Sequence, residues 1–215
     1  MVSLTERDGY DVGLHLLDRQ VVTSDGRLAG KVDDIELLRG EDGTLTPTAL
    51  LTGLPALLPR FDLSVRALPR VIDLDLIEDV DSEVRLTVPG PDPSSPMEPA
   101  RATDPRRLRV SRVLGLPVRC AVVPRRSKVL DLRMLGSPCG PGEHRVTALI
   151  VGPGRPGALF GYDRRSEPGP AAVAAVVRRL HRHARVVDLD DAVELDLDAG
   201  EVRIGPGASL RPLRG

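Results

Sequence analysis

Aromatic residues are scarce in this chain, which has two Phe, two Tyr and no Trp among 215 residues. A hydrophobic core must therefore be built from aliphatic side chains, and β-branched Val and Ile favour pleated, half-buried strands. Cysteine is scarce as well. Cys120 and Cys139 belong to no CxxC motif and no Cys/His cluster with metal-ligand spacing, so we expect two reduced thiols and no metal site.

Long apolar runs are also missing. The first 13 residues contain no apolar stretch of signal-peptide length. No segment approaches the roughly 18 apolar residues that a membrane-spanning helix needs. We therefore expect a soluble, cytoplasmic protein without a transmembrane segment.

The net charge of −1 conceals a contrast between the two halves of the chain. Residues 1–100 contain 9 Lys and Arg against 19 Asp and Glu, which leaves 21 against 12 in residues 101–215. The contrast is explained by attraction between the halves, by a homodimer, or by an anionic partner of the basic half. The first two interpretations are favoured.

An internal repeat organises the chain. Its blocks keep their order, and their offset grows from 97 to 118 residues, so the second copy contains an insertion before its third block. The four matched pairs are Gly30–Leu37 with Ser127–Met134, Thr48–Leu51 with Thr147–Ile150, Arg70–Asp75 with Arg185–Asp190, and Glu83–Leu86 with Glu201–Ile204.

Apolar and polar residues alternate within these blocks, and Gly and Asp turns such as Asp25-Gly26 separate them. This pattern predicts short antiparallel strands in a meander or small barrel. Five Pro within residues 89–99 exclude a helix and a central strand there. We therefore predict a first domain at 10–88, an extended linker at 89–107, a second domain at 108–205 and a flexible tail at 206–215.

The insertion has the pattern of a helix at 170–184. Pro170 suits the first helical position, and no helix-breaking residue follows before Ala184. Val173, Val176 and Leu180 recur at helical spacing, which predicts one buried face. The last two turns of this helix are rich in arginine.

Residues 22–35 resemble the opening hairpin of the PRC-barrel domain, and residues 71–88 resemble its closing segment. This small β-barrel is shared by the photosynthetic reaction-centre H subunit and the C-terminal domain of the bacterial ribosome-maturation factor. The second copy is similar mainly through the first, and the whole resembles tandem PRC-barrel-like proteins of the actinobacterial type. The resemblance implies an all-β chain, mainly β with one helix insertion, of two small antiparallel PRC-type barrels. It also implies a protein-interaction module without catalytic residues.

No set of residues has the spacing of a catalytic, cofactor or metal site. His181 and His183 are two residues apart, so they would point to different sides of a helix and could not share an ion. The acidic residues from Asp73 to Glu83 alternate with apolar ones and are expected on solvent-facing sides of strands. Residues 152–157 are rich in Gly but lack the Lys of a phosphate-binding loop. We therefore expect no enzyme activity and no cofactor.

Arginines of the second half are the candidate partner-binding residues. They could bind a protein partner, the acidic first half, or the phosphates of RNA, although few aromatic residues are present to stack on bases. Our hypothesis is a noncatalytic adaptor that binds a protein; the alternative is an RNA- or ribosome-associated assembly factor that uses the basic second domain. The candidate residues are Arg164, Arg165, Arg178, Arg179, Arg182 and Arg185, with Arg106, Arg107, Arg109 and Arg112 after the linker.

Overall fold

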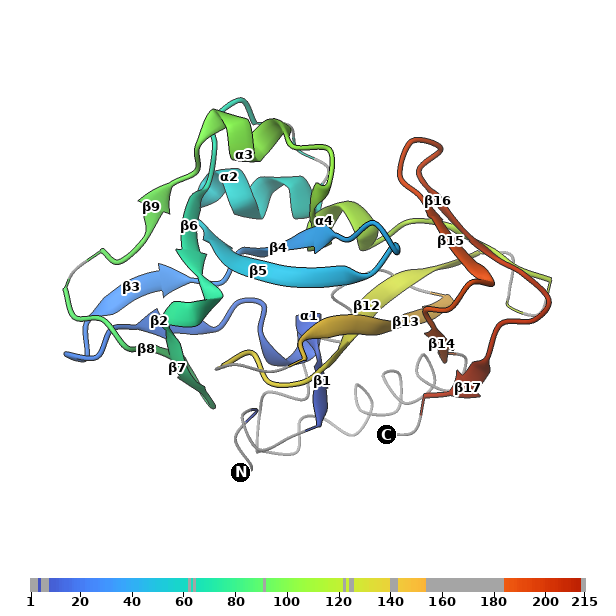
Figure 1. Ribbon diagram of the computed structural model, residues 1–215, viewed down its shortest axis with the longest axis horizontal. Coiled ribbons are helices and arrows are strands. Elements are labelled where there is room, and N and C mark those ends of the chain that lie inside the picture. The colour runs from blue at the N-terminus through green and yellow to red at the C-terminus, as the bar shows by residue number, and fades with distance from the viewer. Residues whose placement is uncertain are drawn as a thin grey trace, which may run out of the picture. The chain divides into compact units, whose positions relative to one another are not determined.

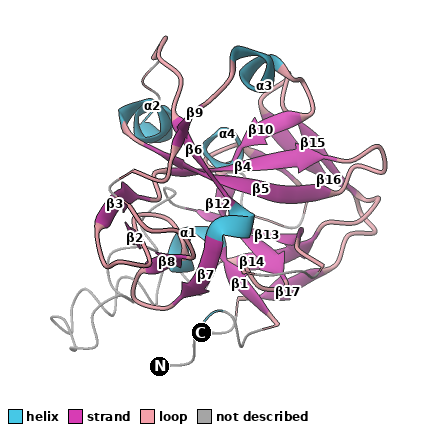
Figure 2. Ribbon diagram, turned by 60° about the vertical axis from the view of Figure 1, so that its left-hand side comes forward, coloured by secondary structure: helices cyan, strands magenta, loops and turns pink. Residues whose placement is uncertain are grey.

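The computed structural model describes residue 4 and residues 8–61, 63, 65–90, 92–121, 123, 126–139, 143–153 and 184–213. Strands make up most of the regular structure in these residues (Figure 2). Their α-helices have only four or five residues each. The predicted all-β class is therefore confirmed. The predicted helix at 170–184 lies outside the described residues.

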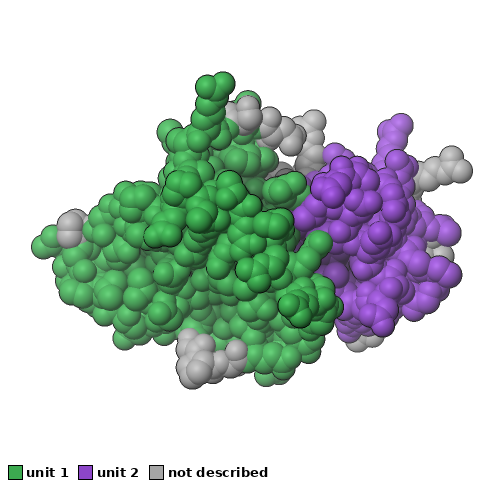
Figure 3. Space-filling model, turned by 45° about the horizontal axis from the view of Figure 1, so that its top comes forward, with its two compact units in different colours: residues 1–112, 134–146 green, residues 113–133, 147–215 purple. Residues whose placement is uncertain are grey.

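The chain divides into two compact units, coloured separately in Figure 3. Unit 1 contains residues 1–112 and 134–146, and unit 2 contains residues 113–133 and 147–215. The chain between β12 (Ser127–Leu135) and β13 (Arg145–Pro153) therefore belongs to unit 1, whereas most residues of these two strands belong to unit 2. These bounds differ from the predicted division at residues 89–107.

Unit 1 is built on two sheets (Figure 1). Their strand orders are β10-β4-β5-β6-β9 and β3-β2-β8-β7. The first sheet contains β10 (Arg107–Arg109), β4 (Asp34–Arg39), β5 (Leu45–Thr52), β6 (Arg70–Asp73) and β9 (Ser95–Pro96), and the second contains β3 (Leu28–Lys31), β2 (Gln20–Val22), β8 (Val84–Leu86) and β7 (Ile77–Val80).

Short helical turns connect these strands. One further strand, β1 (Gly9–Asp11), pairs with β12 near Met134. The helical turns of unit 1 are α1 (Val12–His15), α2 (Leu54–Leu57), η2 (Leu58–Phe61), η3 (Leu74–Leu76) and α3 (Pro99–Thr103), and α4 (Val110–Val113) ends at its boundary.

Unit 2 contains the strand orders β12-β13-β14-β17 and β11-β16-β15. These orders match β4-β5-β6-β9 and β2-β8-β7 of unit 1, so the sequence repeat is also a repeat of topology. The strands are β12 (Ser127–Leu135), β13 (Arg145–Pro153), β14 (Arg185–Asp188), β17 (Leu210–Pro212), β11 (Val118–Arg119), β16 (Glu201–Ile204) and β15 (Val193–Asp196).

Each copy also contains a parallel pair of strands, which the antiparallel prediction did not include. β2 pairs in parallel with β8 through Val21 and Val84, and β11 pairs in parallel with β16 through Val118 and Val202. Sequence periodicity cannot distinguish the two directions, because side chains alternate in both. Within the described residues the pairings give four sheets, each with two edge strands, and no closed barrel.

The predicted linker at 89–107 contributes ordered elements to unit 1. β9 pairs with β6, and β10 pairs with β4 through Leu108 and Leu37. Proline is tolerated in β9 because this strand lies at a sheet edge, and Pro99 lies in the first turn of α3, where its missing N–H is not needed. The proline count correctly excludes a central strand, but an edge strand is compatible with it.

Aliphatic side chains form the core, as the shortage of aromatic residues requires. Both faces of β4 and β5 are largely buried, so these strands lie between two layers of side chains. The predicted hairpin turn at Asp25-Gly26 is confirmed, since it joins antiparallel β2 and β3 and Gly26 has a φ of +78°. The largest fully buried side chains of the core are Leu16, Leu17, Ile35, Leu37, Leu50, Leu51, Ile72, Leu86, Leu132, Met134, Leu149 and Ile150.

Gly136 shapes the chain that follows β12. Its φ is +84°, and a Cβ atom there would lie 1.9 Å from the carbonyl oxygen of Glu143. Gly136→Ala should therefore destabilise the protein more than Gly26→Ala. Gly26 has a similar φ, but a Cβ atom added there would have no other atom within 4 Å. The left-handed conformation alone costs about 1 kcal/mol in either variant. Urea unfolding of both variants measures the difference, and equal losses would contradict a steric role for the Glu143 carbonyl.

Candidate functional site: a groove in unit 1

The structure describes only one of the six arginines predicted to bind a partner. Arg164, Arg165, Arg178, Arg179 and Arg182 lie outside the described residues, as do His181 and His183. Arg185 opens β14, and its Nη1 donates a hydrogen bond of 3.0 Å to the carbonyl oxygen of Ala184. The predicted basic surface therefore stays a prediction.

Three of the four candidate arginines in residues 106–112 form contacts within unit 1. Arg107 forms an ion pair with Glu36, and Arg106 forms one with Asp104. Arg109 donates a hydrogen bond of 3.1 Å to the carbonyl oxygen of Pro55. These internal contacts leave three of the four arginines occupied, which weakens the case for an anion-binding surface at this part of the chain.

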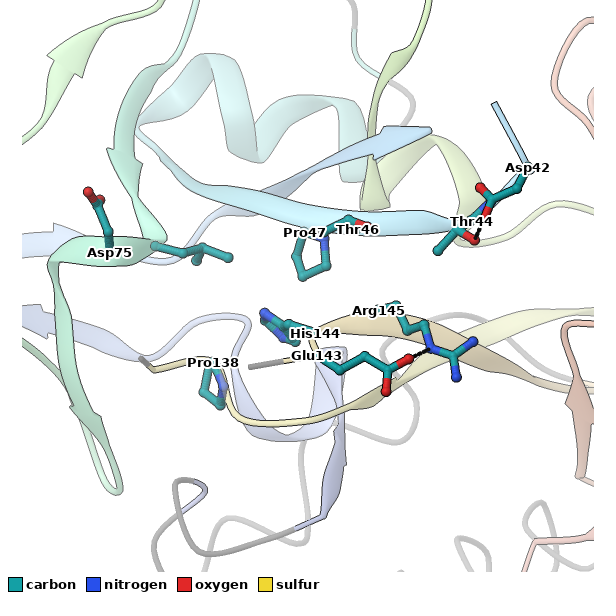
Figure 4. A pocket seen from close by; sticks show the side chains of 10 residues that line it. Asp42, Thr44, Thr46, Pro47, Asp75, Pro138, Glu143, His144 and Arg145 are labelled. Carbon is teal, nitrogen blue, oxygen red and sulfur yellow. Dashed lines mark hydrogen bonds and ion pairs between the residues drawn. The ribbon is translucent and has the colours of Figure 1, made fainter. Parts of the chain in front are cut away.

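A groove of about 850 Å³ opens in unit 1 beside the first residues of β5 (Figure 4). Thr44, Thr46 and Pro47 form one wall, and the other is formed by residues 138, 143 and 144, between β12 and β13, with Arg145 at the start of β13. Leu74 and Asp75 of η3 also line the groove, as does Asp42, which precedes β5. The sequence prediction missed this site because its walls come from three separate segments.

Pro47, Leu74 and Pro138 give the groove an apolar lining, to which His144 adds its ring. The hydroxyl of Tyr10 and Nε2 of His144 form a hydrogen bond of 2.7 Å. Burial lowers the pKa of His144 to about 4, so the ring is neutral at pH 7. Tyr10 is itself buried and holds this ring in place. The groove thus has a neutral, partly aromatic surface between its charged residues.

Carboxylates outnumber cations in the groove. Arg145 is the one cation among the described residues of the lining, and its Nε lies 2.6 Å from Oε1 of Glu143. Asp42 accepts hydrogen bonds from the side chain and the backbone N–H of Thr44, which lower the pKa of its carboxyl. Asp75 is exposed and forms no ion pair in the part of the chain that the structure describes. The groove therefore carries a net negative charge at pH 7.

The thiol beside this groove does not have the properties of a nucleophile. Burial raises the pKa of Cys139 to about 11, so the thiol stays protonated at neutral pH. His144 is neutral and is engaged with Tyr10 rather than with a nucleophile. The described groups of His, Cys, Asp and Glu include no cluster of three that could hold a metal ion. The arrangement is suited to binding.

A second surface feature of unit 1 is an exposed apolar segment in residues 54–68. It follows β5 and precedes β6, and it includes one of the two phenylalanines of the chain, Phe61, with 64% of its surface exposed. Five large apolar side chains in the described part of this segment are exposed, and exposed apolar surface is a common feature of interaction sites in proteins. Its exposed large side chains are Leu54, Phe61, Leu63, Val65 and Leu68.

Two carboxylates of β4 are buried and hydrogen-bonded within unit 1. Asp34 is fully buried and accepts hydrogen bonds from the backbone N–H and the side chain of Ser111. Glu36 is 2% exposed and is bound by Arg101, Arg107 and Thr48. The sequence analysis did not single out either residue. Because the hydrogen-bond partners of both carboxylates lie inside unit 1, both are structural rather than ligand-binding residues.

No protein-family model matches the chain, and no match is found among curated proteins.

None of the helices in the described residues is both long enough and apolar enough to span a membrane.

Proposed function

We propose that this chain is a noncatalytic, cytoplasmic interaction protein built of two PRC-barrel-type modules, and that it binds a protein partner through unit 1. The exposed apolar segment at 54–68 carries this proposal. Leu54, Phe61 and Leu63 are each more than half exposed, and burying such side chains against a partner would stabilise a complex. The repeated strand order supports the tandem-module part of the proposal.

The aromatic residue gives the segment its binding potential. Phe61 is exposed in a protein that has only two Phe and whose core is aliphatic. A side chain of this size contributes most when it enters a pocket on a partner, and the smaller apolar residues around it exclude water. Loops that carry such residues on a rigid sheet are common binding elements. Here β5 and β6 provide that sheet.

Replacing Phe61 and Leu63 by serine tests the proposal. Crosslinking in the native organism, followed by quantitative mass spectrometry, should show at least fivefold less of the principal captured protein for Phe61→Ser/Leu63→Ser than for the unchanged chain. Leu28→Ser is the matched control, because Leu28 is 61% exposed but lies on β3, outside the segment. Equal capture by all three proteins would rule out the segment as the binding surface.

The RNA-associated alternative depends on arginines outside the described residues. It predicts that the full chain binds structured RNA at low salt and that this binding weakens steeply as salt is raised, because phosphate contacts release counterions. A titration at two salt concentrations separates the two functions. No binding at low salt would eliminate the alternative and leave the protein-binding proposal intact.

A further inference from the structure

The charge and lining of the groove in unit 1 point to a particular kind of occupant. We propose that the groove binds an extended protein segment that carries arginine or lysine side chains among small apolar residues. The inference rests on the proposed function, since its ligand is a protein, but it concerns a surface separate from the exposed segment at 54–68.

The charge balance of the lining selects a cation. Among the described residues of the lining, Asp42, Asp75 and Glu143 contribute three carboxylates, against one guanidinium from Arg145, which is bound to Glu143 and whose charge also acts on Asp42. Asp42 and Asp75 form no ion pair with any residue that the structure describes. A cleft whose side chains carry charge of one sign focuses the electric field and attracts ligand groups of the opposite charge. The groove therefore disfavours the phosphates of nucleic acids and favours basic groups.

The placement of the two carboxylates favours an extended ligand over a small cation. Asp42 and Asp75 lie toward opposite ends of the groove, with Thr46 and Pro47 between them (Figure 4). A single ammonium group would satisfy one of the two. A segment with two basic side chains, separated by short residues, could reach both.

The apolar part of the lining suits the stems of these side chains. Arginine and lysine bury their methylene groups on apolar surfaces while the charged end stays in water or meets a carboxylate. Pro47, Leu74 and Pro138 provide such a surface, and the neutral ring of His144 adds no repelling charge. Each basic side chain of the ligand would thus contribute both packing and charge.

Recognition depends on side chains rather than on strand addition. β6 pairs with β5 only from Ala49 onward, so the described pairings leave Leu45–Thr48 without a strand on that side. Pro47 has no N–H to offer a new strand at this edge, and proline at an edge is a common means of preventing strand addition. The segment would therefore lie along the groove without extending the sheet.

Fluorescence anisotropy with the full chain tests the inference. The probe is a fluorescein-labelled peptide of alternating arginine and alanine, and the control peptide has glutamate in place of arginine. We expect the unchanged protein to bind the arginine peptide and not the glutamate peptide. Asp75→Lys should weaken binding about tenfold, because it removes an attraction and adds a repulsion.

Two further variants separate groove binding from a general effect of charge. Glu78→Lys makes the same change of charge at an exposed position of β7, outside the lining, and should change the affinity less than twofold. Thr46→Arg places a tethered cation in the groove and should weaken binding to a similar extent as Asp75→Lys. Circular dichroism confirms that each variant is folded.

The outcomes are distinct for the groove and for the proposed function. Equal losses in Asp75→Lys and Glu78→Lys would show that only the overall negative field attracts the peptide, and would overturn the groove. Absence of binding by the unchanged protein would overturn it as well. Neither result affects the Phe61→Ser/Leu63→Ser experiment, which tests protein binding through the other surface.

Discussion

Glu36→Ala is expected to lower the free energy of unfolding by about 3 kcal/mol. Glu36 is 2% exposed, and its carboxylate accepts hydrogen bonds from Arg101 at 2.7 Å, from Arg107 at 2.6 Å and from Thr48 at 2.7 Å. Burial opposes ionisation of Glu36, but the hydrogen bonds from Arg101 and Thr48 outweigh it and lower its pKa below 4.5. The carboxylate is therefore charged at neutral pH.

The size of this effect follows from what remains after the substitution. Two guanidinium groups would lose their shared partner, and breaking a buried pair by removing one side costs about 3 to 5 kcal/mol. The lower end applies because Arg101 and Arg107 are 24% and 27% exposed and can recover some hydration. For a chain of this length, the melting temperature should fall by roughly 6 to 12 °C.

Calorimetry of Glu36→Ala beside Glu83→Ala provides the measurement. Glu83 also pairs with an arginine, at 3.0 Å from Arg85, but on the surface. Exposed pairs contribute at most about 1 kcal/mol, so this control should unfold near the temperature of the unchanged protein. Similar losses in both variants would contradict the stabilising role of the Glu36 contacts.

Asp34→Asn is expected to change the dependence of stability on pH. Burial raises the pKa of Asp34 from 3.8 to about 6, against the hydrogen bonds from Ser111 and Ile35 that favour the charged form. The folded state therefore binds the proton of this carboxyl more strongly than the unfolded state does. Its contribution to stability is fully present below pH 3.8 and is lost as pH rises through about 6.

Asparagine at position 34 does not titrate, and it can keep the hydrogen bonds of the Asp34 side chain. Its side-chain oxygen can accept from the N–H groups of Ile35 and Ser111, and its amide can donate to the Ser111 hydroxyl. The variant should therefore match or exceed the unchanged protein in stability at pH 8. The unchanged protein should gain on it by up to about 3 kcal/mol as pH falls to 4.

Urea unfolding at several pH values, read as the difference between the two proteins, isolates Asp34 from the other carboxylates. Asp25→Asn is the control of opposite sign, because the hydrogen bond from Thr23 lowers the pKa of Asp25. The contribution of Asp25 is present above 3.8 and is lost as pH falls. A pH-independent difference for Asp34→Asn would contradict the raised pKa.

Much of the fold could be predicted from the sequence, because the repeat and the turns have local signatures. Asp25-Gly26 identified the hairpin between β2 and β3, and the matched blocks correspond to strands in the same order in both copies. The parallel pairing of β2 with β8 could not be predicted, since it joins the beginning and the end of a copy and depends on no local pattern.

The buried carboxylates show why alternation alone misplaces polar residues. It predicts solvent-facing sides for acidic residues, whereas Asp34 and Glu36 lie in a strand that is covered on both faces. One signal was present in the repeat. Asp34 and Asp131 occupy the same position in copies that otherwise differ in charge, and each accepts a hydrogen bond from the N–H of the next residue.

The groove could not be predicted, because its walls meet only in the folded chain. Asp42, Asp75 and Glu143 lie far apart in the sequence, and each has an ordinary surface character by itself. The prediction placed interest in the arginines of the second half. Five of those six arginines lie outside the described residues, whereas the acidic side chains of the groove in unit 1 are described.

The pairing of β10 with β4 has a consequence for how the duplicated chain holds together. β10 begins the second copy, yet it covers the edge of β4 in the first copy, and β1 takes the matching position beside β12. A first copy cut before β10 would lose this strand from the edge of β4, and replacing it with the same strand of another molecule would depend on protein concentration. Joining two copies in one polypeptide supplies the strand from within the same chain, so completion of the sheet becomes independent of dilution.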